Sequence, residues 1–285
     1  MMITRRRWMA GGAALAATLA AGPRIAGAAT APASATARPL GLQLYTVREL
    51  FSRDPHKTLE QVAGIGYREV ESGGGGYDTM DHAALRATMD RTGLTAPSIH
   101  VAYEALAADL DGAVTMAQTL GADTIIVPYM GEAHRTGEAW PRALADFNRW
   151  AGELKAAGIG FAYHNHDFEF THKPGGRSLF DMLVAETDPL LVQLELDLFW
   201  AIDAGEDPKA IIARLPGRIY AYHVKDRTAA GEMTSVGEGT IDFADIFTLN
   251  AEAGVKHLYV ENDQSPAPYL PDIRTSFAAL SGIGA

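Results

Sequence analysis

The sequence predicts a single (β/α)8 barrel, a closed ring of eight parallel strands surrounded by helices. Strand-like and helix-like segments alternate from residue 39 to the end of the chain, which favours a parallel sheet with right-handed crossovers. Four apolar runs in the second half also end in side chains that bind metals. Their ends can converge on one point only if these strands lie parallel and side by side, and eight such units in one domain favour a closed barrel.

The strands are predicted from short apolar runs, several of which alternate with polar residues. The eight runs are residues 40–47, 66–71, 94–101, 122–128, 161–166 (FAYHNH), 191–197 (LVQLELD), 218–226 (RIYAYHVKD) and 255–263 (VKHLYVEND). They share no sequence repeat, so the predicted repeat is structural only.

The helices are predicted from apolar residues at helical spacing and from their end signals. They cover residues 55–65, 81–92, 104–120, 135–157, 178–187, 207–215, 243–253 and 269–280. Pro55 stands at a tolerated first-turn position, and Gly93, Gly121 and Gly158 each follow a helix directly. The four glycines at positions 73–76 lack the lysine or hydroxyl residues of a phosphate loop and are interpreted as a pliable loop.

The amino-terminal residues have the pattern of an export signal. Paired arginines at positions 5 and 6 precede an apolar run at residues 10–21 and an Ala-Gly-Ala cleavage site at residues 26–28. We therefore expect a twin-arginine-type signal peptide at residues 1–28, a linker at residues 29–38, a catalytic barrel at residues 39–285 and a periplasmic location. The apolar run is too short to remain as a stable membrane anchor.

Composition excludes several kinds of partner and chemistry. Loss of residues 1–28, which hold four arginines and no acids, lowers the formal net charge from −11 to −15. Nucleic acid is therefore not expected as a partner, and an apurinic endonuclease, which would need a basic groove, is disfavoured. Cysteine is absent, so the chemistry uses no thiol.

Ionisable residues gather at the predicted carboxyl ends of the strands, where barrels of this kind hold their chemistry. They are Glu71, His100, His164, His166, Glu195, Asp197, His223, Lys225, Asp226 and Glu261. Residues two apart on a strand share a face, so His164 points with His166, and Glu195 points with Asp197. The intervening Leu194 is apolar and is expected to face the helices, as are Leu196, Val224 and Val260.

Less specific interpretations apply to several of these residues. Asp226 and Asp263 are expected to cap helices. Glu195 lies deeper than Asp197, as a buried, salt-bridged carboxylate would. The remaining histidines are interpreted as surface residues on helices or loops: His56, His82, His134, His172 and His257.

Five segments resemble the xylose-isomerase-like TIM barrels known as sugar phosphate isomerases/epimerases. They are residues 41–50 (GLQLYTVREL), 65–71 (IGYREVE), 223–226 (HVKD), 236–243 (VGEGTIDF) and 260–263 (VEND). The resemblance spans the whole predicted barrel and implies a divalent metal held by His164, Asp197, His223 and Glu261. Mixed histidine and carboxylate ligands favour Mn²⁺, while Zn²⁺, Co²⁺ and Mg²⁺ stay open.

The resemblance also implies roles for the other residues at the strand ends. His166, Lys225 and Glu261 are expected to be catalytic, moving a proton next to a carbonyl and stabilising an enediolate. Substrate contacts are expected from Glu71, His100, Glu195 and Trp200, and the substrate is a small carbohydrate. The oligomeric state is left open.

One departure from the family pattern leaves two reactions open. Many members have a carboxylate at the position of His164, where it serves as ligand and base. A two-base epimerase would need His166, Lys225 or Glu195 instead, and whether His164 or His166 meets the metal stays open. The expected activity is a sugar isomerase or epimerase. The alternative is a lyase or hydratase on keto-sugars of the 3-keto-glycoside or inosose type, ahead of a sugar-binding protein without catalysis.

Overall fold

The computed structural model describes residues 38–283, and within this range eight parallel strands close into a barrel. The strands are β1 (Leu40–Gln43), β2 (Glu69–Ser72), β3 (Thr95–His100), β4 (Thr124–Val127), β5 (Gly160–His164), β6 (Val192–Asp197), β7 (Ile219–Val224) and β10 (His257–Val260). Each strand pairs with its neighbours in the chain, and β10 closes the ring by pairing with β1. The predicted fold class is confirmed.

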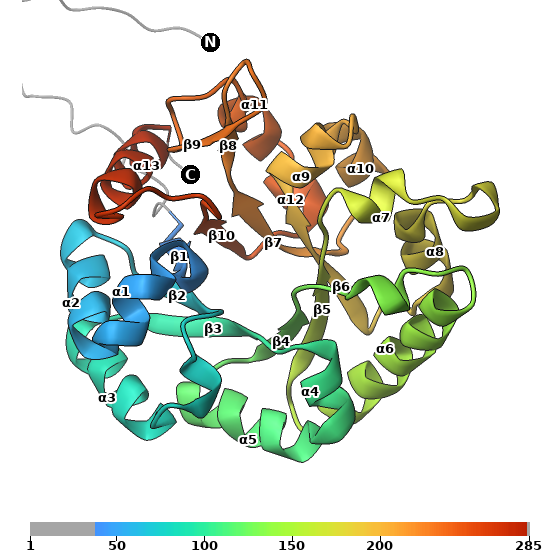
Figure 1. The fold of residues 1–285 in the computed structure, drawn as a ribbon, viewed down its shortest axis with the longest axis horizontal. Coiled ribbons are helices and arrows are strands. Elements are labelled where there is room, and N and C mark those ends of the chain that lie inside the picture. The colour runs from blue at the N-terminus through green and yellow to red at the C-terminus, as the bar shows by residue number, and fades with distance from the viewer. Residues whose placement is uncertain (1–37, 284–285) are drawn as a thin grey trace, which may run out of the picture. The chain divides into compact units, whose positions relative to one another are not determined.

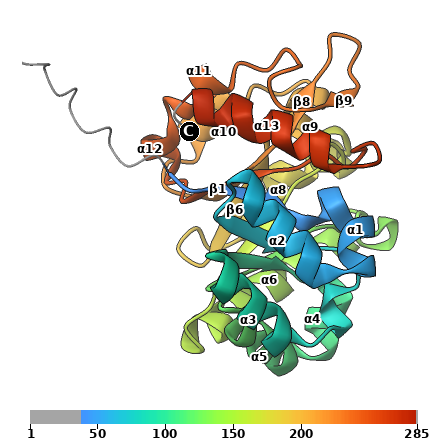
Figure 2. The same cartoon turned by 90° about the vertical axis from the view of Figure 1, so that its left-hand side faces the viewer.

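Helices surround the ring, as Figure 1 shows. They are α1 (Arg48–Arg53), α2 (Pro55–Ile65), α3 (His82–Thr92), α4 (Tyr103–Ala108), α5 (Leu110–Leu120), α6 (Ala139–Ala156), α7 (Phe168–Thr171), α8 (Leu179–Glu186), α9 (Leu198–Asp203), α10 (Pro208–Arg214), α11 (Phe243–Phe247), α12 (Asn250–Ala253) and α13 (Leu270–Gly282). Short 3₁₀ turns are η1 (Leu44–Val47), η2 (Tyr77–Thr79), η3 (Glu132–His134) and η4 (Pro174–Gly176). Figure 2 shows α1 and the hairpin of β8 (Asp226–Arg227) and β9 (Met233–Thr234) on one side of the barrel, opposite α12.

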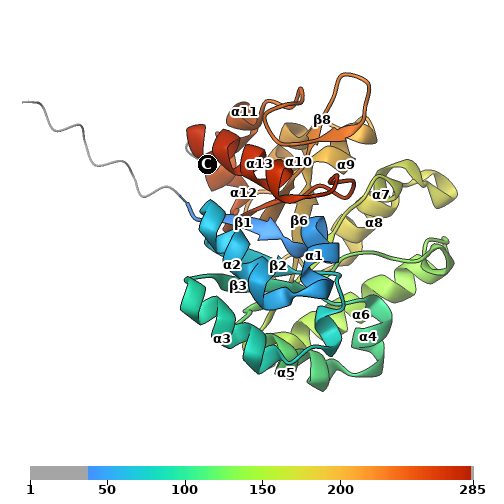
Figure 3. The ribbon, with the colours of Figure 1, turned by 60° about the vertical axis from the view of Figure 1, so that its left-hand side comes forward.

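Alternation along the strands creates two separate apolar clusters. The larger one lies between strands and helices and includes Leu194 and Leu196 of β6; Figure 3 shows α6 and α8 on the outside of this region. The smaller one contains Ile126, Ala162 and Tyr259 and fills the barrel interior. The predicted outward direction of Leu194 and Leu196 follows from this period of two.

Gly41 makes the interior filling possible. A Cβ at this position would lie 2.4 Å from the Tyr259 ring, so only glycine leaves room for that ring. The Tyr259 hydroxyl in turn forms a hydrogen bond of 3.0 Å with the Ser98 hydroxyl. The Tyr259 ring therefore fills part of the barrel interior. Polar side chains lie above it, toward the carboxyl ends of the strands.

Several predicted element boundaries were wrong. The first strand ends at Gln43 rather than at residue 47, because the Gln43 side chain accepts the Tyr45 N–H and starts the turn η1. The helix expected over residues 104–120 is two helices, because Asp109 leaves helical geometry and caps α5. The segment 243–253 likewise holds α11 and α12, and the helix expected from residue 135 begins at Ala139.

The predicted signal peptide and most of the predicted linker lie outside the described residues. Within residues 38–283, no helix is both long and apolar enough to cross a membrane.

Candidate active site

The carboxyl ends of β5, β6, β7 and β10 bring together four side chains with metal-binding chemistry. One ligand atom each from His164, Asp197, His223 and Glu261 lies within 4.8 Å of the others, and all four residues are buried. Strand register explains the convergence, since Asp197 stands directly beside His223 in the parallel ladder. The structure thus groups the four residues that the resemblance implied as metal ligands.

A second group lies deeper in the barrel and shares two of these histidines. Its carboxylate is Glu195, whose Oε2 lies 3.1 Å from His223 Nε2, 3.2 Å from His164 Nδ1 and 2.8 Å from His100 Nε2. Glu195 is fully buried, while His164 and Glu261 line an open cavity. Histidines of both groups therefore reach the cavity, but only the group containing Glu261 also presents a carboxylate to it.

Asp197 is held in place by the start of α9. Its Oδ1 accepts the Trp200 N–H at 2.9 Å, so the carboxylate caps the helix. Its Oδ2 is buried, pairs with the Lys225 ammonium at 2.9 Å and faces the cluster. Burial raises the pKa of Asp197 to about 6.

Lys225 supplies positive charge beside the four residues. Its Nζ lies 2.7 Å from Glu261 Oε2 and 2.9 Å from both Asp197 Oδ2 and Asp263 Oδ2. Burial alone would lower the lysine pKa, but Asp197, Glu261 and Asp263 raise it well above its usual value. The ammonium is therefore charged and balances part of the negative charge at the site.

The two histidines of the cluster have opposite electrostatic surroundings. Burial and the neighbouring His223 hold the pKa of His164 well below its usual value, so its ring is neutral. Burial opposes protonation of His223 too, but Glu195 and Glu261 raise its pKa well above the usual value. Its Nδ1 lies 2.6 Å from Glu261 Oε2.

A divalent cation fits this donor set. Asp197 Oδ2 lies 3.8 Å from His164 Nε2 and 3.9 Å from His223 Nδ1, distances too long for hydrogen bonds but suited to an ion about 2 Å from each atom. Two imidazoles and two carboxylates match the ligand preferences of Mn²⁺ and Zn²⁺. Binding would displace the proton that Glu195 and Glu261 favour on His223, since metal ligands must be deprotonated.

Glu71 is buried below the cavity and does not line it, whereas His100 does. Glu71 is fully buried and accepts hydrogen bonds from Gln43 at 2.7 Å, from His223 at 2.7 Å and from the Ser98 hydroxyl. His100 lines the cavity; burial opposes its protonation, but Glu71 and Glu195 raise its pKa to about 9. Glu71 and Glu195 thus orient histidines from inside the barrel, and the substrate contacts predicted for them stay predictions.

His166 lines the cavity, and its position is fixed by a buried acid. The Glu169 carboxylate accepts the His166 backbone N–H at 2.7 Å and the Tyr163 hydroxyl at 2.5 Å. Burial lowers the pKa of His166 to about 3 and raises that of Glu169 to about 8. In the described part of the chain, His164 belongs to both candidate metal groups and His166 to neither.

Trp200 lies beside the site rather than on the cavity wall. Its ring centroid is 5.6 Å from that of His166, and Lys225 Nζ lies 5.8 Å from the indole. The aromatic face expected to meet a sugar therefore meets these two side chains, and its role as a substrate contact stays a prediction.

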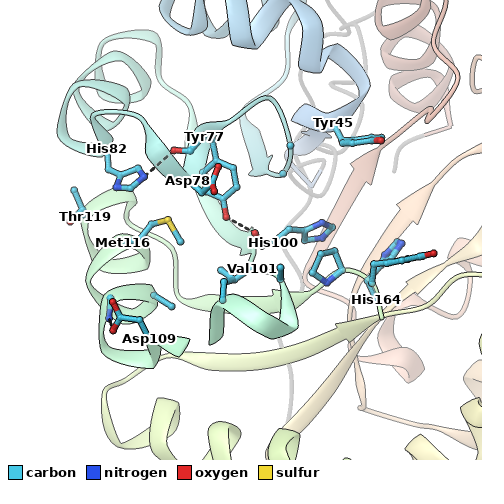
Figure 4. Close-up of a pocket in the computed structure, with 18 of the residues that line it drawn as sticks. Tyr45, Tyr77, Asp78, His82, His100, Val101, Asp109, Met116, Thr119 and His164 are labelled. Carbon is cyan, nitrogen blue, oxygen red and sulfur yellow. Dashed lines mark hydrogen bonds between the residues drawn. The ribbon is translucent and has the colours of Figure 1, made fainter. Parts of the chain in front are cut away.

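The cavity above the cluster has a volume of about 1060 Å³. Figure 4 shows His100 and His164 at one end of it, beneath Tyr45. Tyr45 and Tyr129 are 39% and 48% exposed, so both offer aromatic surface at the rim. Such a mixed polar and aromatic lining is typical of sites for small organic molecules.

Three interpretations from the sequence need correction. Asp263 does not cap a helix; it pairs with Lys225 and lines the cavity, as its position two residues after Glu261 could have indicated. Asp226 accepts backbone N–H groups of the loop at residues 237–241 instead of capping a helix. His257 begins β10 and bonds Glu69 at 2.8 Å rather than lying on the surface.

Comparison with known proteins assigns the sequence of this barrel to one family. Residues 59–276 match the family described as xylose isomerase-like TIM barrel, and the chain belongs to that family. A sugar phosphate isomerase/epimerase from Parabacteroides distasonis is 26% identical, with a TM-score of 0.74 over 88% of this chain and 96% of that one.

Two further proteins match either a smaller part of the chain or the fold alone. The inosose dehydratase of Clostridium tetani is 28% identical over 154 residues, which are 46% of this chain and 50% of the dehydratase. The chain thus spans about half the length of the curated relatives it matches. A xylose isomerase-like protein from Mycobacterium smegmatis, in complex with magnesium, shares the fold at 14% identity and a TM-score of 0.66, covering 87% of this chain and 98% of that one.

Proposed function

We propose that this protein is a divalent-metal-dependent sugar isomerase or epimerase that moves a proton on a carbon next to a carbonyl. The observation that carries the proposal is the convergence of His164, Asp197, His223 and Glu261 within 4.8 Å at the end of an open cavity. The sugar isomerase/epimerase from Parabacteroides distasonis supports a carbohydrate as the substrate.

In this mechanism the four clustered residues hold the metal, which supplies Lewis acidity toward a substrate oxygen. Glu261 and His166 both line the cavity, on β10 and after β5, with two strands between them in the ring. They approach a bound sugar from different directions, and each can accept a proton. Proton transfer by such groups typically contributes about 10²–10⁴-fold in rate. The Lys225 ammonium stabilises negative charge through Asp197 and Glu261.

Solvent deuterium exchange tests the reaction directly. Purified protein loaded with Mn²⁺ is incubated in deuterated water with free ketoses, their phosphates and keto-glycosides, and the products are followed by NMR. We expect deuterium at a carbon next to the carbonyl, together with a new epimer or an aldose partner. Glu261→Gln should abolish exchange, while Glu60→Gln on the exposed side of α2 should not. Absence of exchange on every sugar, with metal bound, would contradict the proposal.

A dehydratase or lyase on keto-sugars is the second candidate. It is favoured by His164, which stands where many family members carry a carboxylate base, and by the inosose dehydratases among the relatives. The two reactions share the proton abstraction and differ in the fate of the resulting enediolate. Loss of water or of a glycosyl substituent, seen in the same NMR spectra as an unsaturated ketone, would favour this candidate over the isomerase.

We also propose that the chain is exported to the periplasm. The proposal rests on the paired arginines Arg5 and Arg6, the apolar run after them and the Ala-Gly-Ala site ending at Ala28. Cell fractionation of the full chain should recover a shortened protein beginning at Ala29 in the periplasm. Replacing both arginines with lysine should retain the full-length protein in the cytoplasm; equal export of both would contradict a twin-arginine signal.

A further inference from the structure

The cavity extends well beyond the metal-binding cluster. Its volume of about 1060 Å³ slightly exceeds the roughly 300–1,000 Å³ typical of ligand pockets, and a single sugar ring fills only part of it. Figure 4 shows His82, Met116 and Thr119 on one side of Tyr77, and His100 on the other. We call the part between η2–α3 and α4–α5 the outer arm, and the part at His100, His164 and Glu261 the inner end.

Polar side chains in the outer arm already bond the protein itself. The Tyr77 hydroxyl donates to the His100 carbonyl, and a ring nitrogen of His82 bonds the Tyr77 carbonyl at 3.0 Å. The hydroxyls of Thr115 and Thr119 donate to carbonyls one turn earlier on α5, at 3.0 and 2.7 Å. The donor protons of these hydroxyls are therefore already used, and the hydroxyls can meet a ligand only as acceptors.

The outer arm also carries two exposed carboxylates, those of Asp78 and Asp109 (Figure 4), and the wall formed by α4, α5 and the end of β3 is mostly apolar. Val101, Ala102, Ala105, Ala113 and Met116 contribute methyl and thioether surface from α4, α5 and the end of β3. Burying apolar ligand surface against such side chains is favourable, at about 25 cal/mol per Å². This wall of the outer arm thus suits an apolar group, while the carboxylates of Asp78 and Asp109 keep their exposure to solvent.

The inner end has the opposite character. His166 Nδ1 is buried there without a hydrogen-bond partner, and His164 and Glu261 bring an imidazole and a carboxylate to the same part of the lining. Buried polar atoms left unpaired are costly, so this end favours a ligand or ion that pairs with them. One continuous cavity therefore joins a polar end to an apolar end.

The glycine loop after β2 shapes the wall of the inner end. Gly74 has φ +68°, and a Cβ there would lie 2.5 Å from the Tyr45 ring. A Cβ at Gly73 would lie 2.6 Å from Gln43 Oε1. Without side chains at these positions, Tyr45 can lie flat beside the loop, where the Arg48 guanidinium lies 4.2 Å from its ring centroid. An exposed aromatic face of this kind suits the apolar face of a sugar ring.

We propose that the substrate is a sugar carrying an apolar substituent of about the size of a phenyl ring. The sugar lies at the inner end, and the substituent occupies the outer arm. This inference rests on the proposed function for the sugar, whereas the binding of the substituent depends only on the outer arm.

Binding of three probes to the Mn²⁺-loaded full-length protein tests the inference. Methyl β-glucoside, phenyl β-glucoside and phenol are titrated by calorimetry, and the Met116 methyl signal is followed by NMR. We expect the phenyl glucoside to bind at least about tenfold more tightly than the methyl glucoside, since each 1.4 kcal/mol of added apolar burial is tenfold in affinity.

Two variants with matched controls place the substituent in the outer arm. Met116→Lys puts a charge on the apolar wall, and Ala105→Trp fills the arm from an exposed position of α4. Both should remove the preference for the phenyl glucoside and leave methyl glucoside binding unchanged. Gln118→Lys and Ala107→Trp change exposed positions on the same helices outside the cavity lining and should preserve the preference.

The outcomes separate the inference from the proposed function. Equal binding of the two glucosides, or a preference that survives both arm variants, would contradict binding of the substituent in the outer arm. The proposed sugar reaction would be unaffected. A Met116 shift with phenol, but no binding of either glucoside, supports the outer arm and counts against the sugar. No response to any probe overturns the inference.

Discussion

At the scale of single residues, the site is a balance of buried charges. Lys225 meets three carboxylates, those of Asp197, Glu261 and Asp263, at 2.7–2.9 Å. Removing a partner from such a buried set is strongly destabilising because it leaves an uncompensated charge. A bound cation would compensate this excess of acid, so the site accommodates both Lys225 and a metal.

Glu169 allows a prediction about pH. Its pKa is raised by burial to about 8, so the folded protein keeps it protonated at pH values where the unfolded chain has released the proton. Stability should therefore fall as pH rises from the usual carboxyl pKa to about 8, at up to about 1.4 kcal/mol per pH unit from this group. Glu169→Gln cannot ionise and should lose stability less steeply.

Urea unfolding of the two proteins between pH 5 and 9 measures this difference. The glutamine oxygen can still accept the His166 N–H, and its amide can donate to Tyr163, so both contacts survive the change. Glu60→Gln, on an exposed surface, should follow the native protein. A stability difference between Glu169→Gln and the native protein that stays constant with pH would show that the buried carboxyl does not titrate in this range.

The rule that strand ends carry the chemistry placed the clustered residues among ten candidates, because parallel strands end at one face of the barrel, and the family resemblance selected the four. Glu169 and Asp263 were not predicted to belong to the site. Glu169 lies on α7, a helix of four residues without a visible sequence period, and its burial depends on tertiary contacts with Tyr163. Asp263 lies just beyond β10, so its inward position depends on how far the strand direction continues.

At the scale of elements, side-chain caps decide where helices begin and end. The apolar spacing over residues 104–120 continues across Asp109, and spacing alone therefore predicts one helix. Asp109 instead accepts the Gly112 N–H at 2.8 Å with φ −153°, which separates α4 from α5. Helices closed by glycine were predicted more accurately, since Gly93 and Gly121 adopt the left-handed geometry that ends a helix.

Replacing Asp109 tests this account of the break. Asp109→Ala removes the acceptor for the first turn of α5 and should reduce the free energy of unfolding by about 1 kcal/mol. Asp109→Asn keeps an acceptor and should cost only a small part of that. Denaturant unfolding of both variants provides the measurement. Equal losses would mean that the carboxylate charge, rather than the cap, holds the break between α4 and α5.

At the scale of the whole molecule, the barrel buries several carboxylates, and burying them costs folding free energy. The interior of the ring is apolar around Tyr259 and polar toward the carboxyl ends, where Glu71, Glu195 and Asp197 are fully buried. The apolar cluster between the strands and the helices must therefore offset the free-energy cost of burying these carboxylates. A ligand that binds only the folded barrel should add to the stability of the fold.

Metal-linked stability is expected from this arrangement. Mn²⁺ at 100 times its dissociation constant should stabilise the protein by about 2.7 kcal/mol, because the four ligands converge only in the folded chain. Thermal unfolding with Mn²⁺ should therefore give a higher Tm than unfolding with a chelator. Asp197→Asn keeps an oxygen to cap α9 at Trp200 but removes the charge at the cluster. Lys225 retains Glu261 and Asp263, so the variant should fold with a lower Tm than the native protein and lose the Mn²⁺ effect. Asp111→Asn, exposed on α5, should keep it. An equal rise in Tm for both variants would mean that Mn²⁺ binds elsewhere on the chain.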